Sequence, residues 1–354
     1  MSIAQDHRGD AAERVARLGR MARRSVSPIV GVLVTFLGLM AITFFIGRVL
    51  PIDPVLAIVG DQADAETYQN VYRELGLDRP LIQQFGIYLA DAFRGDFGTA
   101  RLTGNAVWSD IWAAFPATIE LATFAIVIGA LLGIPLGVTA AVHRGRPLDH
   151  ILRLVMLLGH SVPIFWLGLM GLLLFYAQLG WVGGSGRLSL YNLDLIPAVT
   201  GFNTIDALIA GDWDVFEDAI DHLILPAAIL GYSSTAYIGR MTRSFMLEQL
   251  PQEYIIAARA KGLSRHQVVW RHAFRNIRVQ LLTILALAYG GLLEGTVLIE
   301  AVFGWPGLGQ YFTNALLIGD MNAVMASTLL IGAIFVGLNM LTDLLYRTLD
   351  PRTR

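Results

Sequence analysis

The feature that most constrains the fold is a set of six long apolar stretches. They are Ile29–Gly47, Leu121–Val142, Leu154–Val182, Leu223–Gly239, Val279–Val302 and Met321–Thr342, and only the fifth contains charged residues, Glu294 and Glu300. About 20 apolar residues are enough for a helix to cross the hydrocarbon layer of a membrane. Within lipid, backbone polar groups must be hydrogen-bonded inside the protein, which a helix achieves by itself. The pattern therefore predicts an all-α integral membrane protein with six transmembrane helices, with kinks where Pro135, Pro163 and Pro226 fall inside the spans.

Positive charge is concentrated at alternate ends of these spans. Twenty of the 26 basic residues fall in the N-terminal tail, the second–third loop, the fourth–fifth loop and the C-terminal tail. The opposite loops carry five basic residues and seventeen acidic ones. Because basic loops stay in the cytoplasm, we predict that both termini are cytoplasmic. An odd number of spans would place one arginine-rich terminus outside.

The first 50 residues have a second interpretation, a secretory signal peptide. The apolar stretch is longer than the usual core of such a peptide, and Arg48 to Pro54 contains no small-residue cleavage site. We therefore expect the first span to be retained.

Composition excludes several classes of protein. Apolar residues make up 55% of the chain and charged residues 15%, against about 25% charged in a typical soluble domain, which excludes a disordered chain. The absence of cysteine excludes a disulfide framework and a thiolate metal site. Lys261 is the only lysine and follows Ala260, so the chain lacks the G-K-[ST] sequence of an ATP-binding loop. It also lacks H-E-x-x-H, and no nucleophile and base can be assembled for an intramembrane enzyme.

The chain is expected to have three parts. Residues 1–28 form a basic cytoplasmic tail, residues 29–110 combine the first span with an extracytoplasmic segment, and residues 111–350 form a five-helix core. Within the second part, 78–89 reads as a short amphipathic helix. Its apolar face would contain Leu81, Phe85, Tyr88 and Leu89.

The cytoplasmic loop 250–276 is predicted to be a helix–glycine–helix unit. Pro251 suits a first helical turn, and Glu253 complements the positive end of the helix dipole. The first helix should end near Lys261 at Gly262, which adopts a left-handed cap most easily. Ser264 followed by Gln267 forms a capping box that begins the second helix.

One face of the first loop helix is suited to contact with another surface. Tyr254, Ala257, Ala258 and Lys261 share that face by helical spacing, and the two alanines allow close approach. The eight basic residues between the fourth and fifth spans, from Arg240 to Arg278, would equally favour anionic lipid. From the residues alone, a protein partner and a lipid surface are equal alternatives.

The loop and the motifs around it resemble the permease subunits of binding-protein-dependent ABC importers, and within them the dipeptide/oligopeptide/nickel branch. The resemblance covers nearly everything after residue 29. It rests on Glu253-Tyr254-x-x-Ala257-Ala258-x-x-x-Gly262, His272-Ala273-x-Arg275-Asn276, Leu75-Gly76-Leu77-Asp78-x-Pro80, Gly95-Asp96-Phe97-Gly98, Ser161-Val162-Pro163, Gly295-Thr296-Val297-x-x-Glu300, Pro306-Gly307-x-Gly309 and Asp350-Pro351-Arg352. One departure is Gln280, where such loops usually have a proline. Re-entry into the fifth span should therefore be less kinked.

The resemblance implies a type I ABC-importer permease fold in the inner membrane of a bacterium. It implies partnership with a second permease, two cytoplasmic ATPases that bind ATP and Mg²⁺, and an external solute-binding protein, with no nucleic acid. This chain would itself bind no cofactor or metal and catalyse no reaction. The ATPase-coupling residues carried over are Glu253, Tyr254, Ala257, Ala258, Lys261 and Gly262. Dipeptides, longer peptides, nickel complexes, opines and glycosides remain open as substrates, and peptides are favoured by the branch.

Glu294 and Glu300 are candidates for the translocation path, because ionisable groups inside a membrane are costly and often functional. The alternative is hydrogen bonding to a neighbouring helix or an interfacial position. If both acids carried protons or sodium ions, the chain would instead be a secondary transporter driven by an ion gradient.

Overall fold

The computed structural model describes residues 30–47, 55–60, 62–193 and 195–349, and every regular element in these ranges is helical. The chain divides into two compact units. The first contains residues up to Asp96 together with Thr328–Val336, and the second contains Phe97–Ser327 and the remainder. The basic tail 1–28 and the Asp350-Pro351-Arg352 motif lie outside the described residues.

The first unit contains an apolar helix, Val30–Gly47, followed by α2 (Leu56–Val59), α3 (Ala65–Glu74) and α4 (Leu81–Arg94). Aromatic rings join the first helix to α4: Phe44 lies 5.3 Å from Phe85 and 5.7 Å from Tyr88, centroid to centroid. Burial raises the pKa of Tyr88 to about 12. The predicted amphipathic helix is thus present, although Leu81, expected on its apolar face, is 50% exposed.

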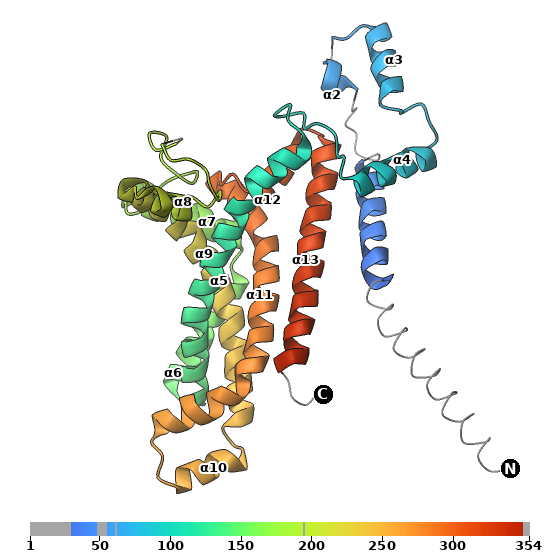
Figure 1. The fold of residues 1–354 in the computed structure, drawn as a ribbon. Helices are drawn as coiled ribbons and strands as arrows, with labels where there is room; N and C mark the ends of the chain where they lie inside the picture. Colours follow the sequence, from blue (N-terminus) through green and yellow to red (C-terminus); the bar gives the residue numbers. More distant parts are fainter. Residues whose placement is uncertain (1–29, 48–54, 61, 194, 350–354) are drawn as a thin grey trace, which may run out of the picture. The chain divides into compact units, whose positions relative to one another are not determined.

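The second unit is a bundle of long helices with shorter ones at its two ends (Figure 1). Its elements are α5 (Val107–Val142), α6 (Pro147–Ser161), α7 (Ile164–Gly171), η1 (Leu172–Gln178), α8 (Asn203–Ala210), α9 (Trp213–Gln249), α10 (Glu253–Ala260), η2 (Gln267–Ala273), α11 (Phe274–Phe303), α12 (Leu308–Leu317) and α13 (Met321–Leu349), of which η1 and η2 are π-helical. Residues 328–336 of α13 belong to the first unit. α5 and α9 continue through Pro135 and Pro226.

Close packing of α5 on α9 holds the bundle together. Gly129, Gly133 and Gly137 are buried along one stripe of α5. A Cβ atom at Gly133 would lie 3.0 Å from the carbonyl oxygen of Thr235 and 3.1 Å from the Cβ of Ile238. Small residues at this spacing let two helix backbones approach closely where lipid provides no hydrophobic drive.

Four described helices are long and apolar enough to cross a membrane: Val30–Gly47, Val107–Val142, Gln267–Phe303 and Met321–Thr342. A fifth candidate is the pair Pro147–Gly159 and Ile164–Gln178, which is bent by 93° around the predicted proline kink at Pro163. The expected fourth span lies inside α9, which is not apolar enough to be counted on composition. The structure therefore supports four or five apolar spans.

The predicted second loop helix and fifth span form one continuous helix, Gln267–Phe303, which runs across the end of the bundle before turning up into α11 (Figure 1). The chain offers no proline between these residues, and Gln280 occupies the expected proline position. The helical hydrogen bonding is continuous although the helix changes direction where it enters α11 (Figure 1), and the weaker kink stays a prediction.

Candidate functional site

The α10 segment is a short rigid projection because both its ends are fixed locally. The α10 helix spans Glu253–Ala260 and is followed by Gly262 at φ +78°. The Gly262 N–H donates to Arg259 O and the Leu263 N–H to Ala258 O, at 3.0 and 3.3 Å. This pair of backbone hydrogen bonds is typical of a helix that ends at a left-handed glycine. The predicted end of the helix is confirmed.

The start of the next helix also follows the prediction. The Gln267 N–H donates to Ser264 Oγ at 3.3 Å, and the Ser264 N–H donates to Gln267 Oε1 at 3.1 Å. This is the reciprocal arrangement of a capping box. Pro251 differs from expectation, because Gln252 is the N-cap of α10 and Pro251 precedes the helix.

The coupling residues do not all lie on one face of α10. Ala258 is 6% exposed and packs with Ile255 on the chain's own apolar cluster, which includes Ile277 and Leu281. The expectation that Ala258 shares an exposed strip is therefore wrong for this chain by itself. Helical spacing places residues 254, 257, 258 and 261 near one another on the helix surface. Ala258 is nevertheless buried, because it and Ile255 pack on the apolar cluster beneath α10.

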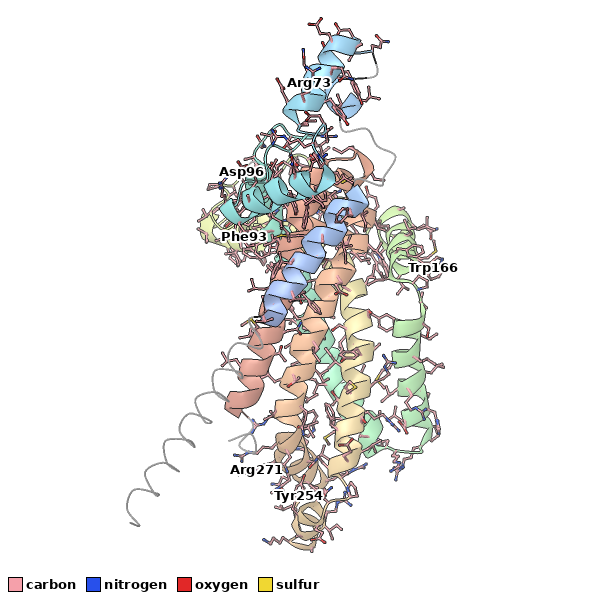
Figure 2. All side chains as sticks on the ribbon, turned by 90° about the vertical axis from the view of Figure 1, so that its right-hand side faces the viewer. Arg73, Phe93, Asp96, Trp166, Tyr254 and Arg271 are labelled. Atoms are coloured by element: carbon pink, nitrogen blue, oxygen red, sulfur yellow. The ribbon has the colours of Figure 1, made fainter. Side chains whose placement is uncertain are left out.

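The outward face of α10 contains the other predicted residues. Glu253, Tyr254, Ala257, Lys261 and Gly262 are all exposed, and Tyr254 and Arg271 lie at the end of the second unit away from Trp166 (Figure 2). The sequence reasoning missed Ile256, which is 58% exposed beside them. An apolar residue on the outer row of an otherwise solvated helix is the signal that would have identified it.

The loop is anchored to the bundle from a second side. Arg265 Nη2 donates to the carbonyl oxygen of Val142, the last residue of α5, at 3.1 Å. Next to this contact is an open groove of about 440 Å³, lined by Val142, Leu250, Arg259, Leu263, Arg265, Val268 and Val269. The segment that follows α10 is thereby tied to the end of α5.

Glu300 clamps the turn that follows α11. Its side chain is fully buried, and its carboxylate accepts hydrogen bonds from Thr118 Oγ1 at 2.7 Å and from the backbone N–H groups of Gly309 and Gln310 at 2.7 and 3.0 Å. Thr118 Oγ1 in turn accepts from the Leu308 N–H at 2.8 Å. These N–H groups are the unpaired donors at the start of α12, where a carboxylate is favourable. The contacts are those of the alternative interpretation, hydrogen bonding to neighbouring elements, and the translocation role of Glu300 stays a prediction.

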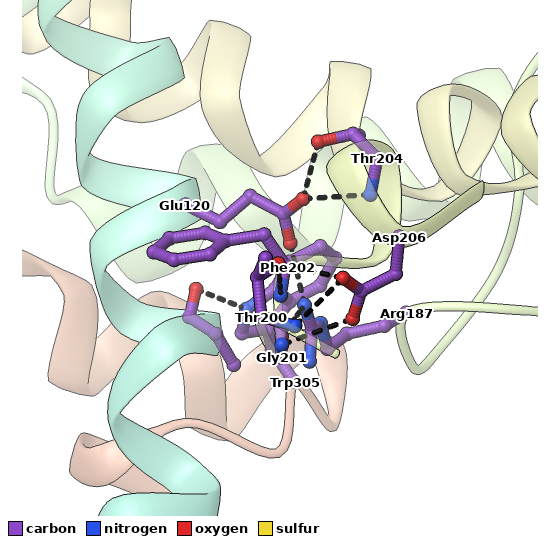
Figure 3. Close-up of polar contacts among 9 residues, drawn as sticks. Glu120, Arg187, Thr200, Gly201, Phe202, Thr204, Asp206 and Trp305 are labelled. Carbon is purple, nitrogen blue, oxygen red and sulfur yellow. Dashed lines mark hydrogen bonds and ion pairs between the residues drawn. The ribbon is translucent and has the colours of Figure 1, made fainter. Parts of the chain in front are cut away.

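A second buried carboxylate fixes the loop between η1 and α8 to α5 (Figure 3). Glu120 accepts from Arg187 Nη2 at 2.6 Å and from the hydroxyl and N–H of Thr204 at 2.6 and 3.0 Å. Arg187 also donates to Gly201 O at 2.8 Å, and its guanidinium lies 5.8 Å from the centroid of the Trp305 ring. Removing one partner of a buried ion pair strongly destabilises the fold, because the other charge is left buried without a partner.

The same loop contains a self-contained turn around Asp206. The N–H and hydroxyl of Thr200 donate to Asp206 Oδ1 at 2.8 and 2.7 Å, and the Gly201 N–H donates to Oδ2 at 2.9 Å. Burial by itself would raise the pKa of Asp206, but these hydrogen bonds outweigh it and hold the pKa below its usual value.

Glu294 differs from the other acids of α5 and α11. Asp110, Glu120 and Glu300 each accept hydrogen bonds within the chain. Glu294 is exposed, and among the described residues it has no hydrogen bond or ion pair. In the described ranges no group of three potential metal ligands occurs.

Comparison with known proteins identifies the family. Residues 133–354 match the family described as binding-protein-dependent transport system inner membrane component, and residues 21–122 match its N-terminal component. The chain is 42% identical over 322 residues to the probable D,D-dipeptide transport system permease protein of Escherichia coli (strain K12), covering 91% of this chain and 94% of that protein. It is 41% identical to the di/tripeptide transport system permease protein of Pseudomonas aeruginosa (strain UCBPP-PA14), covering 90% and 95%.

The fold is also found in a solved structure. A chain of the MetNI methionine ABC transporter in inward-facing conformations matches with a TM-score of 0.50 and 20% identity, covering 66% of this chain and 93% of that one. The apolar helices and the α10 loop are consistent with the family that these similarities indicate. The chain belongs to the family of binding-protein-dependent ABC transport permeases, integral membrane subunits of ATP-driven importers.

Proposed function

We propose that this chain is the permease subunit of an ATP-driven importer of di- or oligopeptides and forms half of its translocation path. The observation that carries the substrate class is the identity of 41–42%, over nine-tenths of both chains, to permeases named for dipeptide and di/tripeptide transport. The partners are a second homologous permease, two cytoplasmic ATPases that bind ATP and Mg²⁺, and an extracytoplasmic solute-binding protein. The location is the inner membrane of a bacterium.

The topology proposed for this role is six transmembrane helices with both termini in the cytoplasm, in the type I permease arrangement. The span missing from the apolar count would be α9, fourth in chain order, which packs along α5 through small residues as membrane helices do. The proposed parts of the chain are a cytoplasmic tail (1–28), the first span with an extracytoplasmic segment (29–110) and a five-helix core (111–350) that contains the coupling loop 250–276. The arginine-rich ends of α9 and of the η2–α11 helix support a cytoplasmic position for α10.

The coupling role of α10 follows from its rigidity and its anchors. Glycine and capping-box ends keep the helix short, and buried Ile255 and Ala258 fasten it to the bundle. An ATPase that moves against the exposed row containing Tyr254, Ala257 and Lys261 would therefore move the bundle with it. A flexible loop would absorb the motion.

The test of coupling is a charge placed on the exposed row. Ala257→Glu should leave the permease in the membrane, reduce co-purification of the ATPases, and abolish peptide uptake by the assembled complex. His150→Glu places the same side chain at an exposed position at the start of α6, outside α10, and should retain uptake. Unchanged uptake and ATPase association in Ala257→Glu would refute the coupling role.

A further inference from the structure

One face of α11 is exposed through the second half of the helix. Between residues 280 and 301 its exposed residues are Gln280, Leu287, Gly291, Glu294, Leu298 and Ala301, spaced three, four or seven residues apart, and buried Ile284 interrupts this row. The flank of the helix that contains Ala288, Leu292 and Ile299 is buried against the rest of the bundle. We call the exposed row the open face of α11. Glu294 is its single charged residue.

Glu294 lies well inside the apolar candidate span Gln267–Phe303. Nine residues separate it from Phe303, the end of α11, which is about 13 Å along a helix at 1.5 Å per residue. With Phe303 taken as the edge of a hydrocarbon layer about 30 Å thick, the carboxylate falls near the middle of the layer. A carboxylate exposed at this depth is costly in lipid, and such groups face a bundle interior or a water-filled cavity.

The other acids of α5 and α11 near the apolar core supply no comparable binding group. Glu120 is paired with Arg187 and Glu300 with Thr118 and two backbone N–H groups. In the described part of α5, α11 and α13, Glu294 is the one acid on an exposed face within the apolar core for which the structure gives no partner. A negative group without a cation beside it selects a positive ligand.

We propose that Glu294 binds the protonated α-amino group of the peptide as it passes along the open face of α11. The inference rests on the proposed function, since a peptide at neutral pH carries one ammonium group at its N-terminus. In the interior of a membrane that charge is stabilised most effectively by an opposite charge that also accepts a hydrogen bond. Glu294 is thus a specificity-determining residue for a free N-terminus, distinct from the selection made by the binding protein.

The first experiment measures water access and charge. The chain has no cysteine, so Leu298→Cys, one turn from Glu294 on the open face, introduces a single thiol. In the complete complex, a cationic methanethiosulfonate should modify this thiol faster than an anionic one, and dipeptide with binding protein should slow both. Adding Glu294→Gln should remove the preference for the cationic reagent. Ile299→Cys, at a fully buried neighbouring position, is the matched control and should not react.

The second experiment measures transport. In proteoliposomes containing the complete complex, Glu294→Gln should lower the maximal uptake rate of a dipeptide by about tenfold or more, the effect of losing one charge-assisted hydrogen bond. Glu294→Asp should recover part of this rate. The concentration of loaded binding protein giving half-maximal uptake should not move.

Three outcomes overturn the inference. Wild-type uptake by Glu294→Gln would show that the charge is not used, and an unreactive Leu298→Cys would show that lipid or protein covers the face. Loss of complex assembly in Glu294→Gln would assign the residue to pairing with the partner permease. Failure of the wild-type complex to import any peptide would refute the proposed function instead, while the labelling experiment would still test the open face and its charge.

Discussion

Removing the Glu300 carboxylate should unfasten the turn between α11 and α12. Glu300→Ala leaves three buried donors without an acceptor: the Thr118 hydroxyl and the N–H groups of Gly309 and Gln310. Each unsatisfied buried donor costs about 1–3 kcal/mol, and part of this cost is recovered when the turn opens to water. We expect the free energy of unfolding to fall by about 3–5 kcal/mol, as for other buried charged groups that lose their partners.

Glu300→Gln separates shape from charge at the same position. Its remaining oxygen can accept from the Gly309 and Gln310 N–H groups, and its amide can face Thr118, whose hydroxyl oxygen can accept. Neutral hydrogen bonds replace charge-assisted ones, so the free energy of unfolding should fall by about 1–2 kcal/mol. Combined with Thr118→Val, the two losses should not add, because the residues share one network.

The assay combines global and local measurements. Chemical denaturation of the purified permease in detergent gives the change in free energy, and hydrogen exchange of the segment 307–313 reports on the amides that Glu300 protects. Exchange there should be faster in Glu300→Ala than in wild type. Glu217→Ala, at an exposed position of α9, is the control and should change stability by no more than about 0.5 kcal/mol. A loss below 1 kcal/mol with unchanged exchange in Glu300→Ala would refute the clamp.

Two further predictions follow from packing and from titration. Gly133→Ala would bring a Cβ atom to 3.0 Å from Thr235 O and 3.1 Å from Ile238 Cβ, so it should lower stability by about 1–3 kcal/mol. Gly295→Ala is the control, because its Cβ would make only an ordinary 3.6 Å contact, and it should not lower stability. Equal melting temperatures for the two variants would contradict the close approach of α5 and α9. The lowered pKa of Asp206 means that its stabilising contribution is complete above the unfolded value of about 3.9 and is lost as the pH falls through the lower folded value. Asp206→Asn should flatten the fall in melting temperature between pH 5 and 3, and an unaltered pH profile would argue against this linkage.

Local features of the structure could be predicted from the sequence because short-range rules decide them. Gly262 ends α10 and the Ser264–Gln267 pair begins the next helix, since both depend on backbone conformation and neighbours within a few residues. The apolar spans could be predicted for the same reason, except that α9 is too polar to be counted on composition alone. The G-x-x-x-G spacing of 129, 133 and 137 was also readable and would have identified the α5–α9 contact.

The roles of the acids could not be read from spacing. Glu120 and Arg187 are 67 residues apart, and Thr118 and Glu300 are 182 apart. Only the folded bundle brings these pairs together and leaves Glu294 exposed. Likewise, helical periodicity grouped Ala258 with Ala257, and the apolar cluster beneath α10 placed one inside and the other outside. The sequence by itself determined which segments are helical and where α10 ends, because those choices are local. Tertiary structure decided which polar groups are satisfied and which stay available, because that depends on contacts between residues far apart in the chain.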